Sequence, residues 1–308
     1  TIERAAAILR SGALVAFPTE TVYGLGASAY DSAAVAKVFE IKGRPTFDPL
    51  IVHVLDEAML GKVVTSVPAL AKRLIEAFWP GPLTLVLNKS SRIPDLVTSG
   101  LSTVAVRMPA HPVAQAILKA CKLPLAAPSA NPFGYLSPTR AEHVERMLGD
   151  RVDLIVDGGA TEYGVESSIL LVEPQPTLLR AGAIPIEALE AIAGPIARML
   201  SDDTKPLAPG RLPQHYAPRT PLRIVDVRDV PLEQRRPAAL LAFRDPKPGY
   251  SAMRILSRRG DLRDAAAHLF QHLHELDELG VERIDVEAVP EEGIGVAIMD
   301  RLHRAAAR

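Results

Sequence analysis

The first part of the chain places an apolar strand, a helix and a second apolar strand in succession, and this order constrains the fold more than any other feature. Residues 13–17 are apolar and stop at a proline, which cannot donate to a continuing strand ladder. A helical pattern covers residues 32–39, with Asp31 or Ser32 as its N-cap. Residues 50–54 form the second strand. This βαβ-like unit predicts an α/β fold, in which ligands bind in the loops that follow the strands.

Polar side chains gather around this unit. The first strand leads into Thr19, Glu20 and Thr21, and then into a turn that contains glycines. Lys42 and Arg44 follow the helix, and a histidine lies in the second strand. Each feature alone has an ordinary structural explanation, namely a capped turn, a solvated pair of cations and a hydrogen-bonded core histidine. Their occurrence within one short unit favours a ligand site.

Length and composition indicate two domains. With 308 residues, the chain is long enough for a hydrophobic core in each of two units. Residues 199–218 have little periodicity and many prolines, as in an extended, semi-rigid connector. We therefore predict a first α/β domain over residues 1–198, a connector over residues 199–218 and a second α/β domain over residues 219–308.

Charge and cysteine content exclude several classes of protein. The formal net charge of -1 gives no overall attraction to nucleic acid, so an RNA contact would need a local basic patch. The single cysteine, Cys121, excludes an intrachain disulfide and disfavours a thiolate-bound metal. The sequence shows no signal peptide and no apolar run of membrane-spanning length. We expect a cytoplasmic protein that does not enter a membrane.

A second set of candidate residues lies in the middle of the chain. Arg107 lies near the end of a strand at residues 103–109, where it either covers a sheet edge or holds a carboxylate. Small residues between prolines at 127–131 either let backbone N–H groups approach a ligand or simply form a turn. A helix follows at residues 140–148, and Glu142 is placed to close a capping box with a hydroxyl residue ahead of it.

Standard nucleotide-binding and hydrolase motifs are absent from the sequence. The chain has no GxxxxGK[ST] phosphate loop, no GxGxxG fingerprint and no GxSxG motif, and its His, Cys and acidic residues lack metal-binding spacing. What remains is a hydroxyl-rich set with the basic side chains of Lys42, Arg44, His53, Arg107 and Arg180. Such a set suits anionic substrates, because transfer of a phosphate-linked group requires mainly positioning and positive charge.

Several motifs occur in the order found in one known family. They are PTETVYGLGA, KGRP, PLIVH, VAVRMPAHP, APSAN, ESS and LLRAGAI, followed by PGRLPQHYAPRTPL in the connector. The chain resembles the YrdC/Sua5 family, the L-threonylcarbamoyladenylate synthases, in its long Sua5-type form and over essentially its whole length. The resemblance implies a YrdC-like twisted α/β domain with a deep positive cavity, a smaller Rossmann-like Sua5 C-terminal domain, and a linker that closes over the site.

The resemblance also implies an activity. The family forms threonylcarbamoyl-AMP and pyrophosphate from L-threonine, bicarbonate and ATP, a nucleotidyltransferase reaction that uses Mg2+ with ATP. A separate transferase then uses the product for the t6A37 modification of tRNA. The expected partners are therefore ATP, L-threonine, bicarbonate and that transferase, with tRNA as a further candidate.

The motifs also assign site residues by resemblance. The residues implied for L-threonine are Thr21, His53, Arg107, Ala127 and Ser167. Those implied for ATP are Arg44, Asp48, Thr103, Ser129, Asn131, Ser137, Arg180 and Tyr216. Lys42 and Arg44 are expected as catalytic groups that offset charge on the phosphates, and no residue is expected as a dedicated metal ligand. Asp48 departs from the family pattern, which has Asn there, and an acid is less favourable near phosphates.

Two alternative functions remain open. A non-catalytic RNA-binding factor would use the first domain's cavity and the arginines at positions 254, 258, 259 and 263, and would bind tRNA in a salt-sensitive way without nucleotide turnover. A generic ATP or carbamoyl-phosphate hydrolase would not depend on threonine. An assay for a threonine-dependent adenylate separates all three functions.

Overall fold

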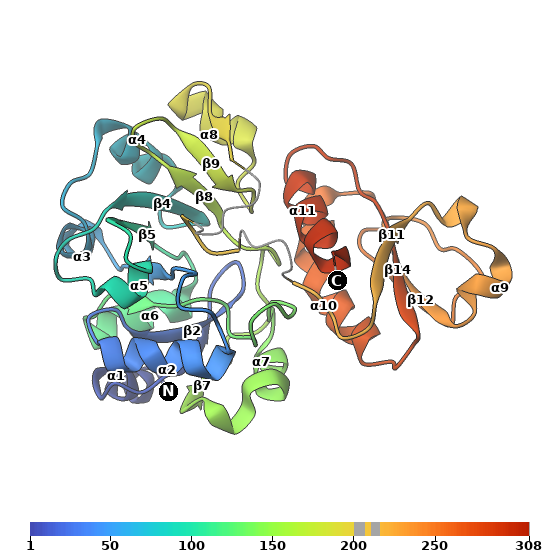
Figure 1. The fold of residues 1–308 in the computed structure, drawn as a ribbon, viewed down its shortest axis with the longest axis horizontal. Helices are drawn as coiled ribbons and strands as arrows, with labels where there is room; N and C mark the ends of the chain where they lie inside the picture. Colours follow the sequence, from blue (N-terminus) through green and yellow to red (C-terminus); the bar gives the residue numbers. More distant parts are fainter. Residues whose placement is uncertain (200–206, 211–215, 308) are drawn as a thin grey trace.

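The computed structural model describes residues 1–199, 207–210 and 216–307. They form two α/β domains side by side, each with its own sheet (Figure 1). The first sheet ends with a strand at residues 197–198, and the second sheet begins at residue 222. The predicted connector, residues 199–218, lies between the two sheets and falls partly outside the described residues. The α/β class predicted from the sequence is confirmed.

A mixed sheet forms the centre of the first domain. Its strands are β1 (Val15–Pro18), β2 (Tyr23–Ser28), β3 (Ile51–His53), β4 (Leu83–Asn88), β5 (Thr103–Arg107), β6 (Leu125–Ala126), β7 (Leu154–Ile155), β8 (Ser168–Leu171), β9 (Thr177–Arg180) and β10 (Ala197–Arg198). Among the described residues the order across the sheet is β10-β9-β8-β4-β5-β3-β6-β2-β1-β7. Val52, Leu85 and Val106 point into the largest core cluster, so their neighbours along each strand point to the opposite face.

Helices surround this sheet and bury its core face. They are α1 (Ile2–Arg10), α2 (Ser32–Lys42), α3 (Glu57–Val63), α4 (Ala69–Phe78), α5 (Asp95–Thr98), α6 (Pro112–Cys121), α7 (Ala141–Leu148) and α8 (Ile186–Ala193). Most agree with the helices that apolar periodicity predicts. The half-buried Trp79, just after α4, donates from its indole nitrogen to the carbonyl of Leu83 at 2.7 Å, so it anchors a corner of the sheet.

A smaller parallel sheet forms the second domain. Its strands are β11 (Leu222–Val225), β12 (Ala238–Ala242), β13 (Ala252–Ile255) and β14 (Arg283–Glu287), in the order β11-β14-β12-β13. Its helices include α9 (Leu232–Arg235), α10 (Leu262–Asp277) and α11 (Gly295–Ala306). All the strand pairs in this sheet are parallel, as in the Rossmann-like domain that was predicted. Helices α10 and α11 lie on the side that faces the first domain (Figure 1).

The opening unit differs from the prediction in one respect. Residues 23–28, expected as a turn, form strand β2, which pairs antiparallel with β1. The pairing needs a glycine at position 26, because a Cβ on Gly26 would lie 2.6 Å from Cε1 of Phe17. The strand–helix–strand unit therefore runs through β2, α2 and β3. Asp31 caps α2 by accepting two backbone N–H bonds, as predicted.

The predicted capping box of α7 is wrong. The helix starts after Arg140, which makes no side-chain cap bond. The hydroxyl residues ahead of it bond elsewhere: Ser137 donates to Glu166 at 2.5 Å, and the N–H of Thr139 donates to Nδ1 of His143 at 3.2 Å. Ser137 has a partner distant in sequence, whereas Thr139 contacts the side chain of His143 in the first turn of the helix and forms no capping box with Glu142.

Helix α10 brings the second domain onto the first. The rings of His143 on α7 and His274 on α10 stack with their centroids 4.0 Å apart. His274 also donates from Nε2 to the carbonyl of Ser137 at 3.1 Å, and Tyr135 donates to Asp277. These contacts end on the segment that contains Ser137, which the resemblance assigns to ATP.

Acidification is expected to weaken this interface. Burial lowers the pKa of His274 from 6.5 to about 4. At pH values between these two pKa values, the imidazole takes up a proton in the unfolded chain but not in the folded protein. The free energy of unfolding should therefore decrease as the pH is lowered, by about 3 kcal/mol at about pH 4. Urea unfolding of the wild type and of His274→Gln at about pH 7.5 and about pH 4.5 measures the effect. The variant should lose less stability, and equal losses would contradict the prediction.

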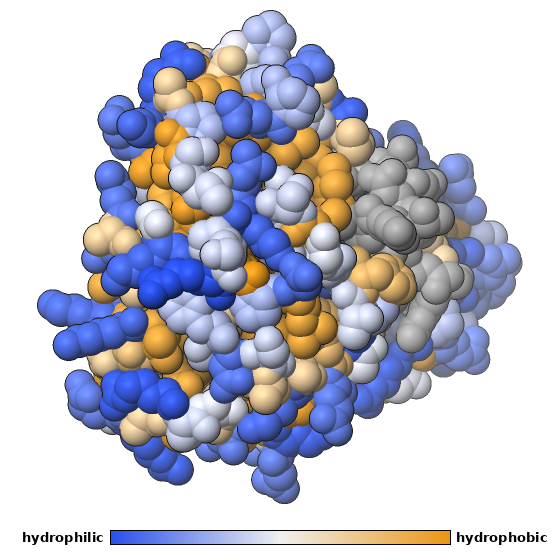
Figure 2. Space-filling view, turned by 60° about the vertical axis from the view of Figure 1, so that its left-hand side comes forward, coloured by the Kyte–Doolittle hydropathy of each residue, from blue (hydrophilic) through white to orange (hydrophobic). Residues whose placement is uncertain are grey.

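Apolar residues on the molecular surface do not form one continuous band. On the face shown in Figure 2 they lie in separate areas, with hydrophilic residues between and around them. The large hydrophobic side chains that are exposed among the described residues are Phe47, Met199, Leu232 and Leu279, which lie far apart in the chain. In the part of the chain that the structure describes, no helix is both long and apolar enough to cross a membrane.

Candidate functional site

One face of the first sheet carries a polar row beside an apolar row. The register of β3 and β5 pairs His53 with Arg107 and Ile51 with Ala105. Strand β4 adds Val86 opposite Ala105. Because side chains alternate along a strand, all five residues point to the face away from the main core. Basic groups and apolar surface therefore lie side by side on this face.

A cavity of about 50 Å3 lies at the polar row. Most of the predicted site residues line it: Thr21, Arg44, His53, Arg107, Ala127, Ser129, Ser167, Arg180 and Tyr216. Arg44 and His53 share this cavity, which is the condition on which the predicted two-substrate site depends. Segments from β1 to the connector thus converge on one hollow.

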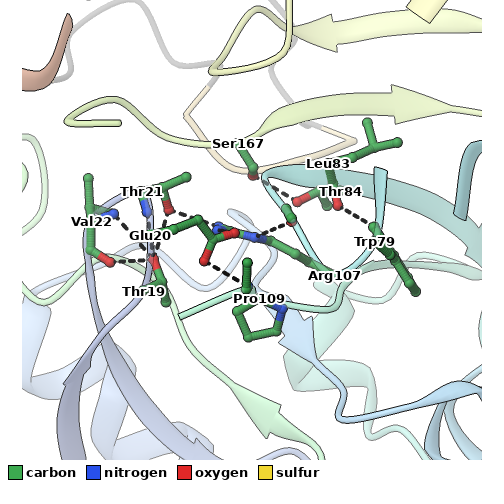
Figure 3. Close-up of polar contacts among 12 residues, drawn as sticks. Thr19, Glu20, Thr21, Val22, Trp79, Leu83, Thr84, Arg107, Pro109 and Ser167 are labelled. Carbon is green, nitrogen blue, oxygen red and sulfur yellow. Dashed lines mark hydrogen bonds and ion pairs between the residues drawn. The ribbon is translucent and has the colours of Figure 1, made fainter. Parts of the chain in front are cut away.

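Arg107 lies at the centre of a network of polar contacts (Figure 3). Its side chain is buried, with 3% of the residue exposed. It donates from Nη2 to Oε1 of Glu20 at 2.6 Å, from Nη1 to the hydroxyl of Thr21 at 2.9 Å and from Nε to the carbonyl of Gly81 at 3.2 Å. Arginine has five N–H donors, so two remain for a carboxylate ligand.

Glu20 holds Arg107 in place and was not predicted as a site residue. Its Oε2 accepts from the N–H of Ala110 at 3.0 Å. Burial alone would raise the pKa of Glu20, but the charge and hydrogen bond of Arg107 lower it below its usual value. The carboxylate is therefore ionised at neutral pH and orients the guanidinium. Its partner lies 87 residues further along the chain, so no local pattern indicates the pair.

His53 is a neutral imidazole in this site. It is buried, and its Nδ1 has no hydrogen-bond partner among the described residues. Burial, reinforced by the charge of Arg107, lowers the pKa of His53 to about 3. That His53 and Arg107 both contact L-threonine, as the resemblance implies, stays a prediction. An uncharged ring offers a hydrogen bond, and the positive charge comes from Arg107 alone.

Arg180 is tied to the start of β8. Its Nε and Nη2 donate to the carbonyl of Ser167 at 3.1 and 3.0 Å, and its Nη1 donates to the carbonyl of Pro209 at 3.2 Å. The hydroxyl of Ser167 also shares a hydrogen bond of 2.8 Å with Thr84 (Figure 3). These contacts join the ends of β4, β8 and β9 into one wall of the cavity.

Arg44 and Asp48 form a buried ion pair, with 2.8 Å between Nη2 and Oδ2. Arg44 also donates to the carbonyls of Asp48 and Pro49, at 3.0 and 2.9 Å. Burial raises the pKa of Asp48, although the charge of Arg44 opposes the rise. Asp48 itself does not line the cavity. The acid that departs from the family pattern therefore holds Arg44 and does not face the space where phosphates would lie.

Lys42, Asn131 and Ser137 lie behind the cavity wall. Lys42 donates from Nζ to the carbonyl of Ser129 at 2.7 Å and to that of Asn131. Burial, together with the charge of Arg44, lowers the pKa of Lys42 well below its usual value. Two of its three N–H donors are thus bound to backbone carbonyls, and the expected role of Lys42 at the phosphates stays a prediction. Asn131 and Ser137 likewise bond to protein groups.

Thr103 is not at the cavity in this structure. It shares one face of β5 with Ala105 and Arg107 but lies at the opposite end of the strand, beside a separate hollow. Ala208 of the connector packs on the apolar row between them, in a cluster with Ile51, Val86, Ala105, Ile169 and Leu179. Connector residues 207–210 thus cover the part of the sheet that joins Thr103 to the cavity.

A second carboxylate that was not predicted, Glu166, lines the cavity. Its Oε1 accepts from Ser137 at 2.5 Å, and its Oε2 accepts from Arg301 of α11 at 2.8 Å. The residue belongs to the ESS motif, but its ion partner lies 135 residues away in the other domain. Only the folded structure reveals this pair.

Gly182 keeps the segment around Ser167 close to the end of β9. A Cβ at position 182 would lie 2.3 Å from the backbone of Ser167 and Ser168. Gly182→Ala is therefore expected to destabilise the protein by about 2 kcal/mol or more, because the backbone must move. Thermal unfolding checks this, with Gly61→Ala in α3 as the control, since nothing lies within 4 Å of a Cβ there. Equal melting of the two variants would refute the prediction.

In residues 1–199, 207–210 and 216–307, no group of three or more His, Cys, Asp or Glu side chains could hold a metal ion. Glu166 at the cavity and Glu20 and Asp48 behind its wall are each paired with an arginine. Mg2+ prefers several oxygen ligands, and an ATP molecule can supply them from its phosphates.

Two other surfaces carry charge. The arginine series at 254–263 is partly neutralised, because Arg254 pairs with Glu275 and Arg263 pairs with Glu162, whereas Arg258 and Arg259 are exposed. A wider cleft of about 800 Å3 lies at the carboxyl ends of β11 and β14. Much of its charge is neutralised within it, by ion pairs such as Lys247 with Glu287. The first cavity, with buried and convergent cations, is the stronger candidate.

Two family models match the chain. The Sua5–YciO–YrdC model, described as "Telomere recombination", matches residues 7–182. A second model, described as "Threonylcarbamoyl-AMP synthase, C-terminal domain", matches residues 184–307. Together they cover nearly all of the sequence and meet just after β9.

Curated relatives align over almost the full length. The threonylcarbamoyl-AMP synthase of Bacillus subtilis is 46% identical over 322 residues, which cover 99% of this chain and 92% of that protein. The threonylcarbamoyl-AMP synthase of Pyrococcus abyssi is 42% identical over 318 residues, which cover 99% of this chain and 93% of that protein.

Solved structures share the fold. The crystal structure of P. abyssi Sua5 complexed with L-threonine matches with a TM-score of 0.94 at 40% identity, over 99% of this chain and 94% of that one. Escherichia coli YciO matches with a TM-score of 0.53 at 26% identity, over 59% of this chain and 88% of that one. The arrangement of both domains is therefore found in a solved protein.

Proposed function

The chain belongs to the Sua5/YrdC family, in its long two-domain form, and we propose on this basis that it is a threonylcarbamoyl-AMP synthase. It is a nucleotidyltransferase that forms threonylcarbamoyl-AMP and pyrophosphate from L-threonine, bicarbonate and ATP. Its product serves a separate transferase in the t6A37 modification of tRNA. The bicarbonate, the transferase and a contact with tRNA are parts of the proposal that rest on family membership.

The convergence of three buried arginines on one cavity supports this proposal most directly. Arg44, Arg107 and Arg180 are 7%, 3% and 6% exposed, and they come from distant parts of the chain. The neutral ring of His53 and the hydroxyl of Thr21 lie beside them. Buried guanidinium groups bind planar or multiply charged oxyanions well, which suits an amino-acid carboxylate next to phosphates.

L-Threonine would bind at the Arg107 end of the cavity. The two unused N–H donors of Arg107 would hold its carboxylate, and the small side chain of Ala127 would leave room for it. His53 would make a hydrogen bond to the substrate through its unpartnered Nδ1. With a pKa of about 3, His53 is too weak a base to retain a proton from the amine at neutral pH.

The reaction would proceed in two stages. The free amine of threonine attacks bicarbonate or CO2, a C–N bond forms, and a carbamate results, with loss of water where bicarbonate is used and of a proton to solvent where CO2 is used. A carbamate oxygen then attacks the α-phosphorus of ATP, the bond to the β-phosphate oxygen breaks, and pyrophosphate leaves. Arg44 and Arg180 would offset charge on the phosphates. Mg2+ bound to the phosphate oxygens would neutralise further negative charge.

ATP binding would require connector residues 207–210 to leave the apolar row. The cavity of about 50 Å3 has room for only a few water molecules. Pro209 accepts from Arg180, and Ala208 covers the sheet next to Ala105. If this segment withdrew, one N–H donor of Arg180 would become free. The cavity would then extend along β5 as far as its first residue, Thr103.

One assay tests the function. The protein is incubated with ATP, labelled L-threonine, bicarbonate and Mg2+, and the products are examined for a labelled adenylate and pyrophosphate. Both should appear together and only when threonine is present. Phosphate release without threonine would favour a hydrolase, and salt-sensitive tRNA binding without any release would favour an RNA-binding factor.

A further inference from the structure

Arg301 reaches from the second domain to the wall of the cavity in the first. It lies on α11, and only 1% of the residue is exposed. Its Nε donates to Oε2 of Glu166 at 2.8 Å, and its Nη2 donates to the carbonyl of Ala181 at 2.9 Å. These two acceptors belong to the first domain, and Glu166 lines the cavity. Nη1 of Arg301 also donates to the neighbouring Asp300 of α11. The second domain therefore places a positive charge directly beside the site.

Glu166 is an unexpected group in a cavity for anionic substrates. Burial alone would raise the pKa of Glu166, but the charges of Arg301 and Arg180 and the hydrogen bond from Ser137 lower it below its usual value. The carboxylate is therefore ionised at neutral pH. A carboxylate close to a phosphate repels it, so Glu166 needs a close cation.

The same arginine also contacts the connector. Cζ of Arg301 lies 4.9 Å from the centre of the ring of Tyr216. Tyr216 lines the cavity and packs on Phe270 of α10, with ring centroids 5.8 Å apart. One guanidinium group thus contacts a cavity residue of the first domain and a cavity residue of the connector, while α10 supports the second of them from behind.

Stability alone does not explain such a contact. Replacing a buried ion pair by apolar groups is often neutral or stabilising, so its presence points to a role in the arrangement of the site. Glu166, which pairs with Arg301, lines the cavity, whereas some other ion pairs between the domains are exposed to solvent. Arg146 and Glu278, for example, form an ion pair between the domains at 45% and 51% exposed side chains.

We propose that Arg301 is a positioning residue of the ATP site, through which the docked second domain offsets the charge of Glu166 and holds Tyr216 in the cavity wall. The second domain is then part of the catalytic unit, and a first domain without it would present to the phosphates a carboxylate that lacks the charge of Arg301. This inference rests on the proposed function, because it assigns the affected step to ATP.

Steady-state kinetics of Arg301→Met test the proposal. The KM for ATP should rise by about tenfold or more, because the charge of Glu166 is no longer offset, whereas the KM for L-threonine should change by less than about twofold. In Glu166→Gln/Arg301→Met the KM for ATP should return to within about threefold of the wild type. Arg146→Met, which removes an ion pair between the domains but lies away from the cavity, is the matched control and should behave like the wild type.

The pH profile adds a readout that a purely structural role would not change. Without Arg301 the pKa of Glu166 should rise, so that lowering the pH from about 8 to about 6 neutralises part of its charge. The ratio of the KM for ATP in Arg301→Met to that in the wild type should then decrease. In the Glu166→Gln background the ratio should not change with pH.

The outcomes are distinguishable. Equal effects of Arg301→Met on both substrates, or no recovery in the double variant, would overturn the proposal and leave Arg301 a purely structural residue. Where Arg301→Met does not fold, Arg301→Gln, which keeps a donor but no charge, is measured against the same expectations. A wild-type protein that forms no adenylate would instead refute the proposed function.

Discussion

Replacement of Arg107 by methionine is expected to lower the affinity for L-threonine by roughly two to three orders of magnitude. Arg107 is held by Glu20 and Thr21 with two N–H donors left for a carboxylate. Removing one partner of a buried, hydrogen-bonded charge pair costs about 2 to 5 kcal/mol, most of it in the dissociation rate. Calorimetric titration with L-threonine measures the loss directly. No other group at this end of the cavity can replace the charge, because His53 is neutral.

Loss of stability must be separated from loss of binding in this experiment. Arg107→Met leaves Glu20 buried without its partner, which is expected to cost about 3 to 5 kcal/mol in the free energy of unfolding. Glu20→Gln/Arg107→Met removes the unpaired charge and should regain much of that stability. Its affinity for L-threonine should stay as low as that of the single variant. Recovery of both properties together would show that Arg107 acts only through the fold.

Most of the fold follows from local patterns in the sequence. Apolar runs between prolines and glycines predict strands such as β4 and β14, and helical periodicity with a capping residue predicts α2. Strand β2 was missed because its glycines suggest a turn, although Gly26 is needed for the close approach of Phe17. The capping box of α7 was wrong because the N–H of Thr139 bonds to His143 and Ser137 bonds to Glu166. In both places specific contacts of the folded chain override the local preference.

The site was predictable from its motifs, but its charge pairs were not. Motif positions such as Thr21, His53 and Arg107 do meet at one cavity. The acids Glu20 and Glu166 can be recognised as site residues only from their pairing with arginines 87 and 135 residues away. Such pairs depend on how elements pack, which sequence spacing does not encode. In the structure the amine of Lys42 bonds to backbone carbonyls, so its expected role at the phosphates stays a prediction.

The role of the connector could be stated from the sequence only in outline. A proline-rich segment predicts a semi-rigid span but not which surface it covers. In the structure Ala208 lies on the apolar row and Pro209 accepts from Arg180. This apolar row lies between Thr103 and the cavity, and Ala208 covers it. The predicted contact of Thr103 with ATP therefore stays a prediction that depends on movement of residues 207–210.

Replacement of Arg44 by alanine is expected to lower kcat/KM for adenylate formation by about thirtyfold to a thousandfold. A preorganised charge in a buried site contributes about 2 to 4 kcal/mol to transition-state stabilisation, and Arg44 is fully oriented before substrate binds. Its guanidinium is held by the Asp48 carboxylate and by the carbonyls of Asp48 and Pro49. Pyrophosphate release at saturating L-threonine measures the effect, with Arg73→Ala, an exposed residue of α4, as the control.

The interpretation of the Arg44→Ala result depends on Asp48. In Arg44→Ala its buried carboxylate has lost its partner, so part of the defect would come from lost stability or from repulsion of the phosphates. Asp48→Asn/Arg44→Ala removes that charge and should restore the melting temperature, because nothing buried remains unpaired. If Arg44 acts on the phosphates, turnover by the double variant should stay at least about tenfold below the wild type. Turnover close to that of Arg73→Ala would instead mean that the pair of Arg44 and Asp48 only supports the fold.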